Sequence, residues 1–248
     1  MLAVSPYAWQ ADFDTTVVVP TLGLAYLFLA GRYAATRREV TLFSAGLVLV
    51  ALAFWSPLHH LGLHYLLTAH LLQNVILAEW APLLVAASIP AAAAAATSRF
   101  RVFRFATAPA FALPTWLLGY YAWHVPAIYD AALRNPPLIH AEHAWYFLSG
   151  VLMWWPVVQS RPRDLASIGR AGYAFAAFVL GAPLGLLLAL IPHPIYAFYV
   201  AVPTRVWGLS PLTDQQIAGV TMASEQALVL ACVCGFWFRR FLHEEGAT

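Results

Sequence analysis

Lysine is absent from the 248-residue sequence, in which all 13 basic residues are arginine. Charged residues of either sign make up only 10% of the chain, whereas an ordinary soluble domain has about 25%. The formal net charge of +2 is far from the strongly basic balance with which proteins neutralise nucleic-acid phosphates. The scarcity of charge therefore excludes an ordinary soluble domain and argues against a nucleic-acid partner.

Cysteine is also scarce. Cys232 and Cys234 lie in one apolar run and lack the C-x-x-C spacing of redox or zinc pairs, so we expect both to be inert residues of a membrane helix. The sequence also lacks a nucleophile–base constellation, a phosphate-cradling glycine loop and a dinucleotide-binding motif. We therefore do not expect an enzyme.

Apolar residues are abundant: 62% of the chain is hydrophobic and the mean hydropathy is +0.71. A membrane crossing uses about 20 apolar residues, and it must be helical here because an open sheet cannot satisfy its backbone in lipid. The charge-poor stretches predict seven transmembrane helices, at approximately 15–33, 41–57, 63–88, 106–123, 140–158, 171–191 and 215–239. We expect an all-α membrane protein with a single polytopic domain over residues 1–248.

The arginines give the orientation of these helices. Eleven of the 13 follow the first, third, fifth or seventh predicted helix, and only Arg134 and Arg205 fall on the other side. The positive-inside rule makes the arginine-rich side cytoplasmic, so we expect the N-terminus outside and the C-terminus inside. A retinal protein has this topology too, but the absence of lysine excludes a retinal Schiff base.

Eight of the nine histidines lie on the outer side or dip in from it, and only His243 is cytoplasmic. His140 and His143 are three residues apart at a helix start, so both rings can share a face while Glu142 points away or caps the helix. Neutral imidazole is the commonest metal ligand in proteins and suits copper, zinc, iron and nickel. The predicted ligands are His70, His124, His140 and His143.

The other outer histidines are weaker candidates for metal ligands. His60 and His64 are one helical turn apart only if the third predicted helix begins early. His59 and His193 are expected to form hydrogen bonds with the backbone or with lipid headgroups.

Further polar residues are expected to line the interior. Gln73 and Asn74 continue the polar stripe of His70 one turn deeper. Glu79 and Glu225 lie deeper still, where a charged side chain costs about 2.5–3.5 kcal/mol, and both interhelical hydrogen bonding and an ion path remain open for them. The other residues predicted to line the interior are Asp130, Asp214, Gln215 and Met222.

Four segments resemble the CtaG family of membrane proteins, which is associated with assembly of caa3-type cytochrome c oxidase. They are SPLHHLGLHYLLTAHLLQN (56–74), WHVPAIYDAAL (123–133), HAEHAWYFLSGVLMWWPV (140–157) and GLSPLTDQQIAGVTM (208–222). The D-Q-Q-x-A-G and W-H-x-P-x-x-Y-D elements are the specific part of this resemblance.

The resemblance implies a seven-helix protein of the bacterial plasma membrane that supplies copper, in an oxidation state left open, to cytochrome c oxidase subunits without catalytic turnover. It places the copper-handling histidines at His70, His124, His140 and His143. The family commonly has H-x-x-x-H on the third helix, whereas this chain has Asn74 four residues after His70, and asparagine is a weak ligand beside imidazole. A homo-oligomer also remains open.

Two other functions stay open from the residues alone. Histidines on different helices can ligate haem axially, as in an electron-transfer protein. Alternatively, Asn74, Glu79 and Glu225 could continue an inward path through a copper transporter.

Overall fold

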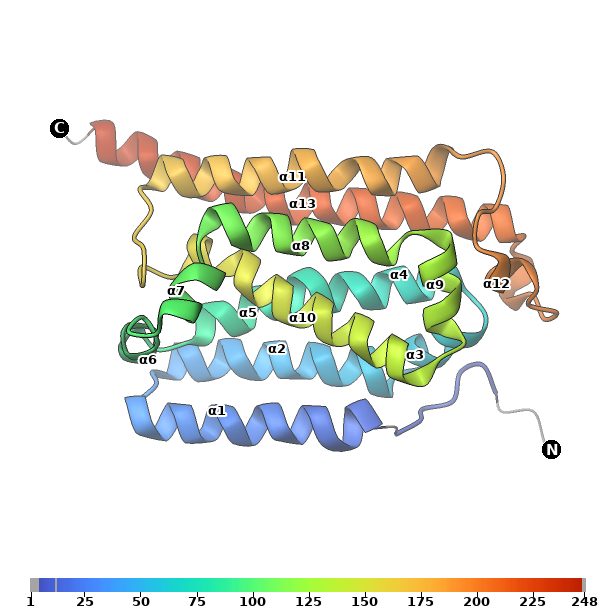
Figure 1. Cartoon of the computed structure of the whole chain (residues 1–248), viewed down its shortest axis with the longest axis horizontal. Coiled ribbons are helices and arrows are strands. Elements are labelled where there is room, and N and C mark those ends of the chain that lie inside the picture. Colours follow the sequence, from blue (N-terminus) through green and yellow to red (C-terminus); the bar gives the residue numbers. More distant parts are fainter. Residues whose placement is uncertain (1–4, 12, 247–248) are drawn as a thin grey trace.

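The computed structural model describes residues 5–11 and 13–246, and no strand occurs among them. The long helices run side by side along one axis as a bundle (Figure 1). Five segments are long and apolar enough to cross a membrane: Asp14–Tyr33, Arg37–Trp55, Leu67–Ser88, Ser167–Leu190 and Pro211–Gly246. The all-helical prediction is therefore confirmed for the described residues.

These five spans comprise η1 (Asp14–Val18) with α1 (Val19–Tyr33), α2 (Arg37–Trp55), α4 (Leu67–Val75) with η2 (Ile76–Trp80) and α5 (Ala81–Ser88), α11 (Ser167–Leu190) and α13 (Pro211–Gly246). Two further long helices run beside them (Figure 1), α8 (Pro109–Trp123) and α10 (Pro136–Val158). The connecting helices are α3 (Pro57–His64), α6 (Ala91–Thr97), α7 (Arg101–Ala106), α9 (Pro126–Leu133), α12 (Ala197–Val200) and η3 (Val206–Gly208).

Several helices begin or end at residues other than those predicted. α2 begins at Arg37 rather than at 41, because Thr36 and Glu39 form a capping box in which each side chain accepts a hydrogen bond from the other residue's backbone N–H. α10 begins at Pro136 rather than at 140, since proline is well suited to the first helical position. The predicted helix 63–88 is interrupted, because Leu66 is extended between α3 and α4.

The spans differ in how tightly they pack. In the most apolar stretch of the span Leu67–Ser88, 67% of the residues are buried. In the most apolar stretch of the span Asp14–Tyr33, only 11% of the residues are buried. α11 and α13 approach each other closely, because a Cβ at Gly219 would lie 2.5 Å from the backbone nitrogen of Ala189. Small residues commonly permit such close approach of membrane helices.

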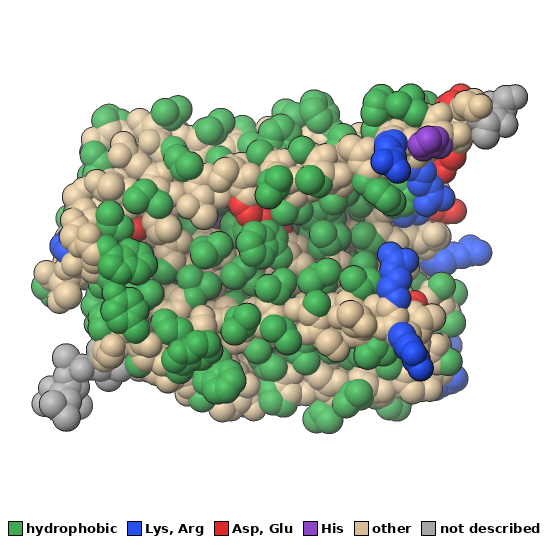
Figure 2. Space-filling view, turned by 180° about the vertical axis from the view of Figure 1, so that it is seen from behind, with side chains coloured by type: hydrophobic (Ala, Val, Ile, Leu, Met, Phe, Trp, Pro, Cys, Tyr) green, Lys and Arg blue, Asp and Glu red, His purple; other side chains and the backbone are tan. Residues whose placement is uncertain are grey.

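The two ends of the bundle carry different side chains. Figure 2 shows arginines gathered at one end and apolar side chains covering the sides. α6 and α7 lie at this arginine end, whereas α3, α9 and α12 lie at the opposite end (Figure 1). We call the end that carries α3, α9 and α12 the histidine end, because the predicted metal ligands lie near it.

Candidate metal site

Two side chains of α10 and one of η1 converge near the histidine end. His140 Nδ1 donates a hydrogen bond to Asp14 Oδ2 (3.0 Å), and His143 Nδ1 lies 3.7 Å from the same oxygen. One ligand atom from each of the three residues lies within 4.8 Å of the others. In the described part of the chain, no other group of three or more His, Cys, Asp or Glu side chains is this close. We call these three residues the Asp14 triad.

His143 connects the triad to the neighbouring histidines. Its ring centroid lies 6.0 Å from that of His59 and 6.2 Å from that of His70. The side chain is 3% exposed, and neither ring nitrogen has a hydrogen-bond partner. A buried polar atom without a partner costs about 1–3 kcal/mol, a cost that coordination of a metal ion would offset. The donor set and the unpaired nitrogens of the triad therefore fit a metal ion.

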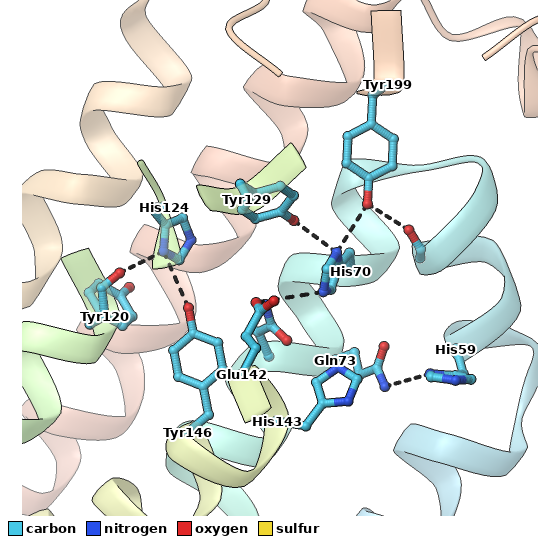
Figure 3. A network of polar contacts seen from close by, with 12 residues as sticks. His59, His70, Gln73, Tyr120, His124, Tyr129, Glu142, His143, Tyr146 and Tyr199 are labelled. Atoms are coloured by element: carbon cyan, nitrogen blue, oxygen red, sulfur yellow. Dashed lines mark hydrogen bonds and ion pairs between the residues drawn. The ribbon is translucent and has the colours of Figure 1, made fainter. Parts of the chain in front are cut away.

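His70 lies in an adjoining hydrogen-bond network (Figure 3). Tyr199 donates its hydroxyl proton to Gly62 O (2.6 Å), so the 3.1 Å contact between its oxygen and His70 Nδ1 requires the proton to be on Nδ1. The hydroxyl oxygen of Tyr129 lies 3.0 Å from the same nitrogen. A neutral imidazole with this tautomer has its lone pair on Nε2. His70 Nε2 is buried and has no hydrogen-bond partner.

His124, which caps α8, is held in the same tautomer. Its Nδ1 donates to Tyr120 O (2.7 Å), because a carbonyl oxygen can only accept. Its Nε2 is likewise buried without a partner. The structure thus brings His140 and His143 together with Asp14, whereas His70 and His124 lie outside this triad, each with Nδ1 engaged and Nε2 unpaired.

Glu142 neither points away from the histidines nor caps α10, so that prediction is wrong. Its side chain is fully buried and lies 3.8 Å from His70 Nε2, and its Oε1 accepts a hydrogen bond from Asn74 Nδ2 (2.9 Å). α10 packs against α8 and α9 as well as against α5 and η2, so a broad part of its surface faces inward. Asn74 therefore forms an interhelical hydrogen bond at the position where the family commonly has histidine.

α3 arranges the two remaining candidate ligands. It begins at Pro57 and is separate from α4, so His60 and His64 lie one turn apart on a short helix of their own rather than on an early start of the third predicted helix. Their ring centroids lie 4.6 Å apart. Burial, and secondarily His59, lowers the pKa of His60. Burial, and secondarily His60 and His59, lowers the pKa of His64. Both imidazoles are therefore neutral near pH 7, as metal ligands must be.

Three of the predicted lining residues bind backbone groups at this end of the bundle. Asp130 accepts hydrogen bonds from the backbone N–H groups of Ala197 and Phe198 (3.0 Å each). Asp214 accepts from those of Leu67 (2.7 Å) and Thr68 (3.0 Å), and so caps α4 from α13. Gln215 accepts from that of Ile195 (2.8 Å). The acidic residues of the two specific family motifs thus hold segments in place beside the histidines.

The deeper polar residues join helices to one another. Glu79 Oε1 accepts a hydrogen bond from Gln226 Nε2 (2.9 Å), and Glu225 Oε1 accepts one from Trp80 Nε1, so both carboxyl groups link η2 with α13. Met222 is buried in the apolar core. Nearer the histidine end, Gln73 Nε2 donates to His59 Nδ1 (2.8 Å). His59 therefore binds a polar side chain of α4 beside His143, rather than only backbone or lipid.

An all-helical bundle with several apolar spans and a histidine–carboxylate group near one end defines a multi-pass membrane protein with a candidate metal site. The sequence profile of the family described as cytochrome c oxidase caa3 assembly factor matches residues 24–244, and the chain belongs to this family. No curated protein and no solved structure matches the chain. Asp14 precedes the matched segment, whereas both triad histidines lie within it.

Proposed function

We propose that the protein is a non-catalytic assembly factor that holds copper at the Asp14 triad and delivers it to subunits of caa3-type cytochrome c oxidase. The observation that carries this proposal is His143, a buried imidazole with no hydrogen bond at either nitrogen, next to a carboxylate and a second imidazole. Copper is the cargo of this site, and its binding through His140 Nδ1 would release the proton now donated to Asp14.

Copper is the metal that the CtaG resemblance implies, and it is compatible with the donor set. Imidazole nitrogens suit copper, zinc, iron and nickel, and geometry and availability select among them. His70, whose ring centroid lies 6.2 Å from that of His143, and His124 each have an Nε2 without a hydrogen bond, and these nitrogens would accept the ion in a second step. The hydrogen bonds at Nδ1 would orient the two rings, as outer-sphere partners of metal-bound histidines commonly do.

We infer that α8 and α10 also cross the membrane, which makes seven crossings in a single polytopic domain of the bacterial plasma membrane. The arginine end would then face the cytoplasm and the histidine end the outside. A reporter that works only in the cytoplasm should be active when it is fused to the C-terminus. A reporter that works only outside the membrane should be active when it is inserted beside Arg134. The opposite activities would place the copper site on the cytoplasmic side and overturn the delivery route.

The direct test is the copper content of the purified protein and of a His143→Ala variant. His193 is an exposed histidine outside the triad, so His193→Ala is the matched control. We expect wild type and control to retain copper through gel filtration and His143→Ala to lose it. Equal retention by all three would refute the site. A visible spectrum of the same samples distinguishes a copper protein from the haem alternative, because a haem protein shows a Soret band.

A further inference from the structure

A cavity of about 370 Å³ at the histidine end has four histidines in its wall. They are His59, His60, His64 and His140. His64 is exposed, whereas the other three are partly buried. Arg134 is the only charged side chain in the lining. The cavity therefore offers a set of imidazoles that is open to the outside and shares only His140 with the Asp14 triad.

His60 and His64 form a preorganised pair within this cavity. They lie one turn apart on α3, and His60 Nε2 is buried without a hydrogen-bond partner. α3 is fixed against α4, because a Cβ at Gly62 would lie 2.9 Å from the Cα of His70, and Tyr199 binds Gly62 O. The two rings are thus held close to each other before any ligand arrives.

His140 connects this pair to the triad. It lines the cavity of His60 and His64 and also a second cavity of about 350 Å³, whose wall includes Asp14 and His143. Its side chain is 36% exposed, whereas those of His143 and Asp14 are 3% and 6% exposed. An ion released by the pair therefore meets His140 before it reaches the buried members of the triad.

We propose that His60 and His64 form a second, outer copper site that captures the ion and passes it through His140 to the Asp14 triad. This inference rests on the proposed function. Two imidazoles leave the other coordination positions to water or to ligands of the copper carrier, so the pair exchanges its ion more readily than the triad. Monovalent copper fits this site, because Arg134 repels a divalent cation more strongly than a monovalent one.

Stopped-flow loading of the full-length protein in detergent tests this order of events. The probe is the coloured Cu(I)–bicinchoninate complex, whose bleaching reports transfer of copper to the protein. We expect two phases in wild type: a fast one for capture and a slow one for burial in the triad. His64→Ala alters an exposed side chain and should remove the fast phase, slow loading at least tenfold, and leave the copper retained after overnight incubation unchanged.

Two further variants complete the test. His60→Gln should reproduce the kinetics of His64→Ala, because the two residues form one site, and combining both changes should add little. His143→Ala should keep the fast phase and lose retention. If His64→Ala loads copper with wild-type kinetics, the outer site is refuted and the proposed function stands. The same conclusion follows if His143→Ala loses both phases. No copper bound by wild type would instead refute the proposed function.

Discussion

The Asp14 triad and the His70 network lie side by side, but Asp14 of the triad belongs to a span that is packed much more loosely than the span of His70. Asp14 begins the most loosely packed span, in which 11% of the apolar stretch is buried, whereas His70 and Asn74 belong to the span in which 67% is buried. In the His70 network Nδ1 is engaged by tyrosine oxygens, whereas His143 in the triad has no hydrogen bond at either nitrogen. We infer that the network stabilises the bundle, and that the triad, one of whose ligands lies on a loosely packed span, takes up and releases an ion.

The variant Asp14→Ala tests most severely whether the triad binds copper while the His70 network stabilises the bundle. We expect copper affinity to fall by about a hundredfold, because loss of a ligand costs at least as much as loss of an outer-sphere partner. The melting temperature should change little, since α1 contributes few buried residues. Competition with a calibrated copper chelator and a thermal melt on the same preparation measure both quantities. A large loss of stability with unchanged affinity would reverse the roles assigned to the two regions.

Asn74→His changes the network instead of the triad. The larger imidazole would replace a buried amide that donates to Glu142, and overpacking of this kind costs about 1–3 kcal/mol. We expect a lower melting temperature and unchanged copper retention. A rise in copper affinity, larger at pH 7 than at pH 5.5, would instead show that this helix supplies ligands through the family's H-x-x-x-H spacing.

Acid should stop copper capture by His60 and His64 only at a pH lower than that at which a free histidine becomes protonated. Burial lowers the pKa values of His60 and His64 from their usual value, which is about 6.5, so both rings remain neutral somewhat below that pH. Fast capture of copper should therefore persist as the pH falls through 6.5 and disappear only as it falls through the lowered pKa values. A pH series of the stopped-flow amplitudes tests this order, and loss of the fast phase above pH 6.5 would contradict it.

The smallest effect is expected at the arginine end. Cys232→Ser and Cys234→Ser, singly or together, should leave copper content and loading rates unchanged, because neither thiol belongs to a group of converging ligands in the described residues. Metal analysis of the double variant is sufficient. A measurable fall in bound copper would show that thiolates compete with the histidine end for the ion.

Sequence patterns located the histidine end but not the composition of the triad. The spacing of His140 and His143 was sufficient to predict that both rings could share a face of one helix. Asp14 was missed because it lies 126 residues from His140, and only the tertiary fold brings the two side chains together. An acidic residue at the outer start of the first predicted helix was the one available signal.

Glu142 and the motif carboxylates show a second limit. Helical periodicity says which residues share a face, but the neighbours of α10 decide how much of its surface is buried, and they bury Glu142 together with His143. Asp130 and Asp214 stand in the most specific family motifs, yet both bind backbone N–H groups. A motif alone does not distinguish a ligand from a side chain that positions the loops around it.

X-ray absorption at the copper edge tests the central claim most directly, because it identifies the atoms bound to the ion. For the copper-loaded wild type we predict a first shell of nitrogen and oxygen with the multiple scattering of two imidazoles, and the loss of one imidazole in His140→Ala. A copper–sulfur shell, or a spectrum that His140→Ala and Asp14→Ala leave unchanged, would contradict the assignment of copper to the Asp14 triad.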